Sequence, residues 1–445
     1  MINVREAAFG VLDKVLSEGA YSNLALNQCI KENNLKSVDA SFLTALVYGT
    51  LERLVTIDYI IRSLSSVPFR KIEPATLIIL RMGIYQLLYM DKVPDSAAVN
   101  ESVKLAKEKK LFKSSGFING LLRSFLRNEK KYSLPDEKDK SCYLSVKFSC
   151  PEYLVSLWLK AYGEEITSEV LASLSGRPPL SIHTNTLKLT PGELLSNLKA
   201  EGVEAQQSKI LPELLTVQNT GGIDSLTSFK KGEFFVQDES SALCAYFTGA
   251  KEGDTVFDIC SAPGGKAFSM AMMMNNIGVI KAFDIHVHKI KLIEAGAYRL
   301  GIKNIKPSVR DGAEDKELCD KADIVLCDVP CSGFGIIRRK PEIRYTKEAN
   351  YSELPALQLR ILENSARLVK KGGILQYSTC TLNPQENSEI AERFLELHPE
   401  FKPRELTLPK GVYRKIDEPI NQLTMFPEEN GGDGFFVASF ESVGD

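Results

Sequence analysis

The sequence has almost no net charge, few histidines and no long apolar run. Its 55 lysines and arginines against 57 acidic residues leave a net charge of −2 over 445 residues, so only a local basic patch could attract nucleic acid. The most apolar stretch, ATLIILRMGIYQLLYM, is interrupted by Arg81 and is shorter than the roughly 20 residues of a membrane-spanning helix. The N-terminal residues include charges where a signal peptide would be apolar. These absences predict a cytoplasmic protein without a membrane partner.

The cysteines and histidines exclude two further classes of protein. The nine cysteines are an odd number at irregular spacings, which is typical of a reducing compartment rather than of a disulfide framework. The sequence has no CxxC pair of the metal-binding kind, and only His286 and His288 of its four histidines lie close together. We therefore expect neither a metal ion nor a structural disulfide.

The length suggests about three domains of ~150 residues each. Residues 1–135 repeat apolar side chains at helical spacing, which predicts an all-α bundle of about five to seven helices. Residues 136–225 begin with a polar stretch resembling a linker, followed by strand and helix patterns that predict a small α/β module. Residues 226–445 alternate continuous apolar strands with helices, which predicts a Rossmann-like, doubly wound and mostly parallel sheet.

One stretch of the first domain is strongly basic. Between residues 104 and 131, nine lysines and arginines face only two acidic residues, which leaves a net charge of +7. The pattern fits an ordinary solvated helix face, and it fits equally well a patch that follows RNA phosphates. The basic residues are Lys104, Lys107, Lys109, Lys110, Lys113, Arg123, Arg127, Lys130 and Lys131.

The segment FDICSAPGGKAFS follows the first strand of the predicted parallel sheet. Its two glycines permit a tight turn, but it matches neither the P-loop GxxxxGK[ST] nor the dinucleotide motif GxGxxG. Asp284 ends the next strand, where an acid can bind both ribose hydroxyls, and Asp311 follows the third, although either alone could cap a loop. A ribose and an adenine without a phosphate cradle indicate S-adenosylmethionine. The predicted cofactor-binding residues are Cys260, Ser261, Ala262, Pro263, Gly264, Gly265, Lys266, Asp284, Asp311 and Asp328.

Two cysteines end two further predicted strands, Cys331 in DVPCSGFG and Cys380 in GGILQYSTCT. One cysteine alone is usually structural, but two on the ligand side of the sheet favour covalent catalysis. A thiolate that adds to carbon 6 of a pyrimidine turns carbon 5 into a nucleophile for a methyl group. A protonated Asp328 would donate to ring N3, Lys266 would hold the base and lower a thiol pKa, and the second thiol would assist elimination. The residues by themselves do not rank the two thiols.

Four motifs resemble those of the RNA cytosine-5 methyltransferases of the NOL1/NOP2/Sun family, in order and spacing: DICSAPGGKA, DVPCSGFG, STCTLNPQEN and GGDGFFVA. The N-terminal third, with LVYGTLER and GFINGLLR, resembles the NusB RNA-binding fold. The resemblance implies S-adenosylmethionine as cofactor and 16S (small-subunit) ribosomal RNA as substrate. It also implies that Cys380 is the nucleophile and that Cys331 assists product release. We expect a monomer.

Three residues depart from the family pattern, and three other functions compete. Ala267 stands where threonine is usual, His183 where arginine is common and Phe148 where histidine is frequent; the last two bear on RNA contacts rather than on the chemistry. A cytosine-5 methyltransferase of DNA would use Cys331 as nucleophile, and one acting on tRNA would share the present motifs. A non-catalytic RNA-binding or antitermination protein would need neither the cofactor loop nor the thiols.

Overall fold

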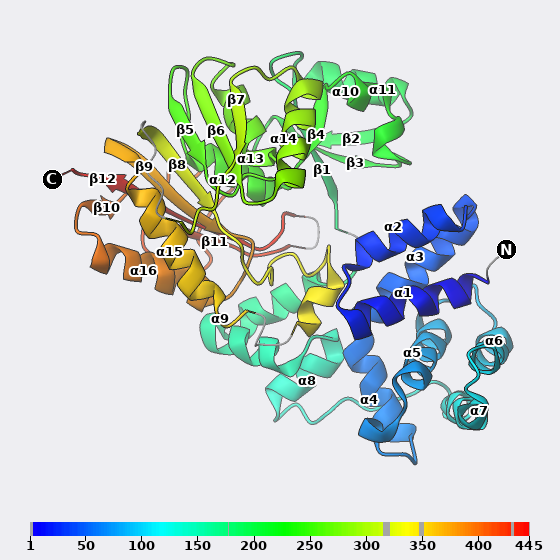
Figure 1. Ribbon diagram of the computed structural model, residues 1–445. Helices are drawn as coiled ribbons and strands as arrows, with labels where there is room; N and C mark the ends of the chain where they lie inside the picture. The colour runs from blue at the N-terminus through cyan, green and yellow to red at the C-terminus, as the bar shows by residue number, and fades with distance from the viewer. Residues whose placement is uncertain (1–2, 177, 315–320, 347–350, 429–430, 445) are drawn as a thin grey trace. The chain divides into compact units, whose positions relative to one another are not determined.

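A computed structural model describes residues 3–176, 178–314, 321–346, 351–428 and 431–444. The chain forms two compact units. The first contains residues up to 176 together with residues 337–346, and the second contains residues 177–336 and 347–445 (Figure 1).

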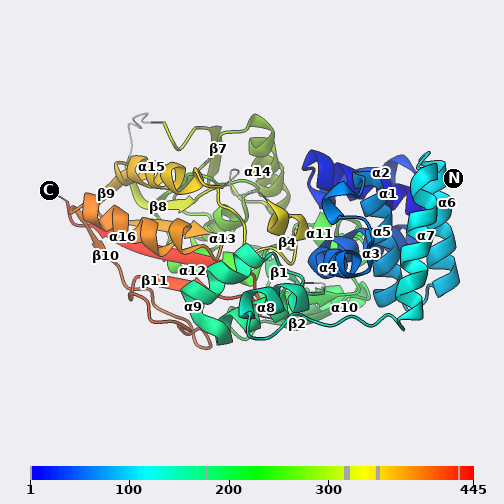
Figure 2. The same cartoon turned by 90° about the horizontal axis from the view of Figure 1, so that it is seen from below.

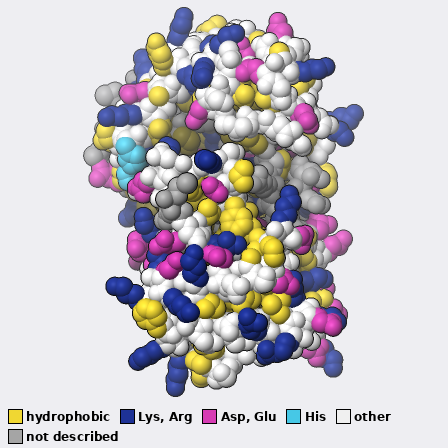
Figure 3. All heavy atoms as spheres, turned by 90° about the vertical axis from the view of Figure 1, so that its right-hand side faces the viewer, with side chains coloured by type: hydrophobic (Ala, Val, Ile, Leu, Met, Phe, Trp, Pro, Cys, Tyr) yellow, Lys and Arg dark blue, Asp and Glu magenta, His cyan; other side chains and the backbone are white. Residues whose placement is uncertain are grey.

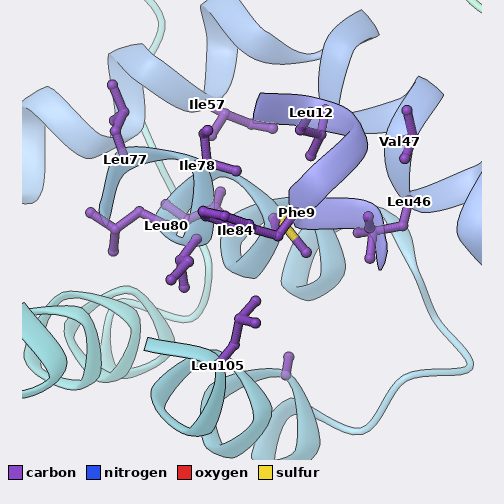
Figure 4. Close-up of a cluster of buried hydrophobic side chains, with 14 of the residues drawn as sticks. Phe9, Leu12, Leu46, Val47, Ile57, Leu77, Ile78, Leu80, Ile84 and Leu105 are labelled. Carbon is purple, nitrogen blue, oxygen red and sulfur yellow. The ribbon is translucent and has the colours of Figure 1, made fainter. Parts of the chain in front are cut away.

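The first unit is a helical bundle with a continuous apolar core. Seven α-helices end by Arg127, which confirms the predicted all-α fold. The core is assembled chiefly from α1, α3, α4 and α5, and Phe9, Leu12, Ile57 and Ile78 point into it (Figure 4). The helices of the unit are α1 (Val4–Glu18), α2 (Ser22–Glu32), α3 (Ser37–Glu52), α4 (Leu54–Leu64), α5 (Pro74–Tyr89), α6 (Asp95–Glu108), α7 (Phe112–Arg127), α8 (Lys140–Phe148) and α9 (Glu152–Ser173).

The polar stretch at 132–150 is not only a linker, because it contains helix α8. The Asp139 side chain caps this helix by accepting a hydrogen bond from the Cys142 N–H, and Leu144 and Val146 are buried. The Thr56 hydroxyl of α4 donates to the Val146 carbonyl at 2.6 Å. Tertiary packing of two apolar side chains therefore stabilises a helix that the polar composition conceals.

Residues 337–346 pack within the helical unit although they lie far along the chain. The Glu342 carboxylate accepts from the Ser22 N–H and hydroxyl at the start of α2, at 3.1 and 2.6 Å. The buried Arg344 donates to the Ser149 carbonyl at 2.8 Å, and the Tyr345 hydroxyl donates to the Leu51 carbonyl at 2.7 Å. Nothing in the sequence pattern predicts this placement, because the contacts join residues that are far apart in sequence.

The second unit begins with a four-stranded antiparallel sheet in the order β2-β3-β1-β4. The alternating segment LSIHTNTL and the apolar segment LLTVQ indicate β1 and β3 in the sequence, whereas β2 and β4 leave no such pattern because they are only four and three residues long. His183 of β1 is buried and stacks on Phe235, and its Nδ1 donates to the Gln237 amide oxygen at 2.7 Å. The elements are β1 (Leu180–Thr184), α10 (Pro191–Ala200), β2 (Glu204–Gln207), β3 (Leu214–Gln218), α11 (Thr227–Lys230) and β4 (Phe234–Val236).

The larger sheet has eight strands, with β10-β12-β9-β8-β5-β6-β7 in order and β11 paired to β12. Strands β5 to β9 are parallel and β10, β11 and β12 run antiparallel, which confirms the Rossmann-like prediction. The strands are β5 (Thr255–Asp258), β6 (Val279–Asp284), β7 (Ile305–Val309), β8 (Ala322–Asp328), β9 (Val369–Thr379), β10 (Phe401–Pro403), β11 (Gln422–Met425) and β12 (Phe435–Ser442).

Helices cover both faces of this sheet (Figures 1 and 2). Alternation along β8 sends Ile324 and Leu326 into one core and Val325 and Cys327 into the other. The first core packs against α12 (Glu239–Phe247), α13 (Gly265–Met273) and α14 (Val287–Leu300), and the second against α15 (Leu354–Ala366) and α16 (Ser388–Leu397). The strand order reverses between β5 and β8, so a ligand crevice is expected beyond their carboxyl ends.

No single helix among the described residues is long and apolar enough to cross a bilayer. Helices α3 and α4 together reach that length and apolar character, but they form a pair bent by 72°. Their apolar side chains lie in the core of the helical unit.

Candidate active site

The predicted cofactor loop leaves β5 at Asp258 and enters α13 at Gly265. The Ser261 N–H donates to the Phe283 carbonyl of β6 at 2.7 Å, which fastens the loop to the neighbouring strand. Gly264 has a φ of +108°, and a Cβ there would lie 2.6 Å from the Phe268 ring. Only glycine fits this turn, both by backbone conformation and by space.

A cavity of about 510 Å³ opens beside this loop, a volume typical of small-molecule sites. Five predicted cofactor residues line it: Cys260, Ala262, Asp284, Asp311 and Asp328. The other predicted residues (Ser261, Pro263, Gly264, Gly265 and Lys266) are not among its lining residues. The sheet therefore brings the ends of β5, β6 and β8 and the segment after β7 to one hollow.

The other residues of the cavity wall were not predicted from the sequence. Among them, Lys289, Arg310 and Arg360 are cationic, and Lys289 Nζ lies 3.4 Å from an Asp284 carboxylate oxygen. Leu357 adds apolar surface to the wall. Acids suited to ribose and amine groups, cations suited to a carboxylate and apolar walls suited to an adenine together fit S-adenosylmethionine.

Asp258 is completely buried at the end of β5, and neither carboxylate oxygen has a hydrogen-bond partner. Burial, with the negative charge of Asp328 as a smaller cause, raises the pKa of Asp258 from 3.8 to about 7.

This buried acid predicts an unusual pH dependence of stability. Between about pH 4 and pH 7 folded Asp258 holds a proton that the unfolded chain has released, so its contribution to stability falls as the pH rises. Asp258→Asn removes this penalty. In urea unfolding of the ligand-free protein, the difference in free energy of unfolding between the variant and wild type should grow by on the order of 2 kcal/mol from pH 5 to pH 8, in favour of the variant. A difference that stays constant across this range would show that the carboxyl does not titrate there.

Lys266 and Asp328 form a nearly buried ion pair with 2.6 Å between Nζ and Oδ2. Burial alone would lower the pKa of Lys266, but the Asp328 carboxylate outweighs it and raises the pKa above its ordinary value. The Ser378 hydroxyl donates to the other Asp328 oxygen at 2.9 Å. Both oxygens of Asp328 therefore accept hydrogen bonds at the mouth of β8.

The two predicted thiols meet at this edge. Cys331 Sγ lies 3.2 Å from Cys380 Sγ, and both cysteines are free and partly exposed. The hydrogen bond to Cys380 raises the pKa of Cys331 well above its ordinary value, and burial and the Glu386 carboxylate act in the same direction. The expectation that Lys266 lowers a thiol pKa therefore does not hold for Cys331, which is a protonated thiol.

Most other cysteines have the surroundings of structural residues. Burial raises the pKa of Cys150, Cys244 and Cys327 to about 12 in each case, so these thiols are unreactive. Cys319 lies outside the described residues.

Backbone contacts fasten the motifs of the two thiols to each other. The Gly335 N–H donates to the Cys380 carbonyl at 3.0 Å, and the Gly434 N–H donates to the Gly335 carbonyl at 2.9 Å. A Cβ on Gly335 would lie 2.0 Å from the Gly434 oxygen, so no other residue fits there. The segments DVPCSGFG, GGDGFFVA and STCTLNPQEN can therefore pack this closely because Gly335 and Gly434 have no side chain.

No group of three or more His, Cys, Asp or Glu side chains suited to a metal ion occurs among the described residues. The site is thus built from a nucleotide-type cavity, a lysine–aspartate pair and two adjacent thiols at the carboxyl edge of a doubly wound sheet. The fold and the site define the class, a Rossmann-like α/β domain with a nucleotide-type cavity, joined to an all-α helical unit.

Comparisons with known proteins define the family. Residues 245–441 match the family described as 16S rRNA methyltransferase RsmB/F, residues 2–127 match the NusB family, and residues 150–224 match the ferredoxin-like domain of RsmF/B-like methyltransferases. The chain is 38% identical to a probable ribosomal RNA small subunit methyltransferase B of Bacillus subtilis (strain 168), covering 99% of both chains. A protein of Synechocystis sp. with the same description is 35% identical over the full length of both.

A solved structure agrees with these matches. The crystal structure of PH0851 superposes with a TM-score of 0.81 at 28% identity, covering 99% of both chains. The chain belongs to the ribosomal RNA small subunit methyltransferase B family, whose enzymes use S-adenosylmethionine.

Proposed function

We propose that this protein methylates carbon 5 of a cytosine in 16S ribosomal RNA through a covalent bond between Cys380 and carbon 6. The observation that carries the proposal is the 3.2 Å approach of two free thiols next to the Lys266–Asp328 pair. A methyltransferase acting on an exocyclic nitrogen needs no thiol, because that nitrogen is already nucleophilic. The relatives described as small subunit methyltransferases support the choice of RNA.

The residues can be assigned to successive steps. When bound in the cavity, S-adenosylmethionine supplies an electrophilic methyl group. The Cys380 thiolate bonds to carbon 6, while the proton needed at ring N3 comes from Lys266 through Asp328. After methylation, water takes the carbon 5 proton and the electron pair of that C–H bond restores the double bond between carbons 5 and 6. Cys380 leaves carbon 6 as a thiolate, and the N3 proton returns through Asp328 to Lys266. Cys331, a protonated thiol beside Cys380, assists this release.

The residues of the cavity and of the loop have separate roles in the proposed cofactor site. The segment Cys260–Lys266, Asp284, Asp311 and Asp328 hold S-adenosylmethionine, with Asp284 on the ribose and Asp311 towards the adenine. Support comes from the cavity that Cys260, Ala262, Asp284, Asp311 and Asp328 line together.

Methylation of 16S ribosomal RNA from a strain lacking this gene tests the function. Purified protein and S-adenosylmethionine should form 5-methylcytosine, located by bisulfite sequencing and confirmed by mass spectrometry of nucleosides. A methyl group on another atom, on tRNA or DNA in preference to 16S RNA, or no transfer by folded protein would refute the proposal. The target base must leave its stack to reach the thiols, so an unpaired cytosine is expected.

We also infer that the basic stretch of α6 and α7 contributes to RNA binding by a cytoplasmic, monomeric protein. Four of its nine cations form ion pairs, and two of these pairs use acids from outside the stretch: Lys109 with Glu6 and Lys130 with Asp95. The local excess is therefore five positive charges rather than seven. On the face shown in Figure 3, lysines and arginines are spread out, with acidic side chains between some of them. RNA contact thus depends on a few exposed cations.

Reversal of three exposed cations should weaken RNA binding selectively. Lys110→Glu, Lys113→Glu and Arg123→Glu together should reduce the salt dependence of RNA affinity by a slope of about 3, because each phosphate contact releases counterions. A matched control carries Lys199→Glu, Lys251→Glu and Lys303→Glu, three exposed lysines of the second unit. Equal affinity of the two triple variants in filter binding at several salt concentrations would mean that the face is only solvated.

A further inference from the structure

Two adjacent residues of the segment NPQEN hydrogen-bond around the two thiols, Glu386 next to Cys331 and Asn387 next to Cys380. Both side chains are buried, with exposed fractions of 0% and 2%. They precede α16 on the chain and lie within the second unit. Neither was predicted as a site residue.

Glu386 contacts the residues around Cys331. Its Oε2 accepts from the Ser332 N–H at 2.8 Å, and its Oε1 accepts from the Ser332 hydroxyl at 2.5 Å. The buried Gln358 amide donates to Oε2 and also to the Pro330 carbonyl, both at 2.9 Å. The residues before and after Cys331 are therefore both tied, directly or through Gln358, to one carboxylate.

Asn387 contacts the residues around Cys380 in the same way. The Thr379 hydroxyl donates to its Oδ1 at 2.6 Å, and its Nδ2 donates to the Thr381 carbonyl at 2.9 Å. The flanks of Cys380 are thus both bound to one amide. The Ser332 and Thr381 hydroxyls, 2.7 Å apart, join the two sets.

A buried carboxylate without a cation among its hydrogen-bond partners is costly, and four donated hydrogen bonds offset that cost. A neutral residue would fill the same space without the desolvation penalty. The carboxylate at this position therefore indicates a role beyond packing. Its hydrogen bonds reach Ser332 directly and Pro330 through Gln358, so this role concerns Cys331, which lies between them.

We propose that Glu386 and Asn387 are positioning residues that fix the two thiols separately, Glu386 the releasing thiol Cys331 and Asn387 the nucleophile Cys380. The roles assigned to the two thiols rest on the proposed covalent mechanism. The hydrogen bonds around the thiols do not depend on it. Its consequence is that adjacent residues control different steps of one reaction.

Two isosteric variants separate these roles. Glu386→Gln replaces one accepting oxygen with a donor that faces a donor, so the Cys331 loop loosens. This variant should transfer a methyl group normally in a single turnover, but turn over about tenfold more slowly and accumulate a protein–RNA adduct that resists denaturation. Asn387→Asp places an oxygen against the Thr381 carbonyl. This variant should slow methyl transfer itself about tenfold, without accumulating adduct.

The matched control is Glu389→Gln on the exposed side of α16, which should behave as wild type. If both variants were slow in the same step, either in methyl transfer or in release, the two residues would support only the common fold, and the proposal would be overturned. Wild-type turnover in both would overturn it equally. Should Glu386→Gln fail to fold, Ser332→Ala removes the 2.5 Å hydrogen bond and the contact with the Thr381 hydroxyl but keeps the N–H bond to Glu386, and it should show the same adduct in weaker form.

A second measurement needs neither RNA nor activity. Diamide oxidises two adjacent thiols to a disulfide and takes up both hydrogen atoms, and mass spectrometry of peptides reports the Cys331–Cys380 product. Both positioning variants should form it at least about fivefold more slowly than Glu389→Gln, because the thiols are no longer held together. If wild-type protein makes no 5-methylcytosine, the proposed function fails, and this oxidation rate still decides whether Glu386 and Asn387 hold the thiols.

Discussion

Cys331→Ala is expected to become trapped on its RNA, whereas Cys380→Ala is expected to lose methylation by about a thousandfold or more. Without Cys380 no bond to carbon 6 can form, so carbon 5 stays unreactive. Without Cys331 the attack and the methyl transfer proceed, but the release of Cys380 is impaired. The variant therefore collects as a covalent protein–RNA complex. The 3.2 Å separation of the thiols makes these opposite outcomes possible within one site.

Denaturing electrophoresis with radiolabelled RNA measures both outcomes in one gel. Cys142→Ala, in the helical unit, is the matched control and should behave as wild type. An adduct from Cys380→Ala and none from Cys331→Ala would exchange the two roles and assign this protein the mechanism of the DNA enzymes.

Asp284→Ala should weaken the binding of S-adenosylhomocysteine by about 100-fold, since two hydrogen bonds from ribose hydroxyls to a carboxylate are lost. Asp284 ends β6, is largely buried and lines the cavity. Its Oδ1 already accepts from the His286 N–H at 3.0 Å, which fixes the carboxylate in place before a ligand arrives.

Titration calorimetry gives the affinity directly, and RNA is not needed. Glu294→Ala, an exposed acid on α14, keeps the net charge equal to that of Asp284→Ala and should bind as wild type. Full affinity in Asp284→Ala would remove the ribose assignment, and the absence of binding by folded wild-type protein would remove the cofactor assignment altogether.

The fold class, and the acids and cysteines that follow the strands, could be read from local patterns. The apolar runs IKPSV and ADIVLCD coincide with β7 and β8, because strands buried on both faces leave a continuous apolar signal. The short strands β4, β10 and β11 left no such signal, because three or four residues do not establish a period. The helix α8 was concealed by polar neighbours for a comparable reason.

By itself, the sequence determined which chemical groups follow each strand, because the order of strands, glycines, acids and cysteines is local information. Only the tertiary structure decided how those groups meet. In the β8–β9 register Asp328 pairs with Ser378, which brings two thiols 49 positions apart in sequence to 3.2 Å. Glu386 and Asn387 became recognisable as supports of those thiols only through hydrogen bonds across this register. Residues 337–346 likewise joined the helical unit through long-range contacts. Such contacts depend on the path of the whole chain, which no local pattern contains.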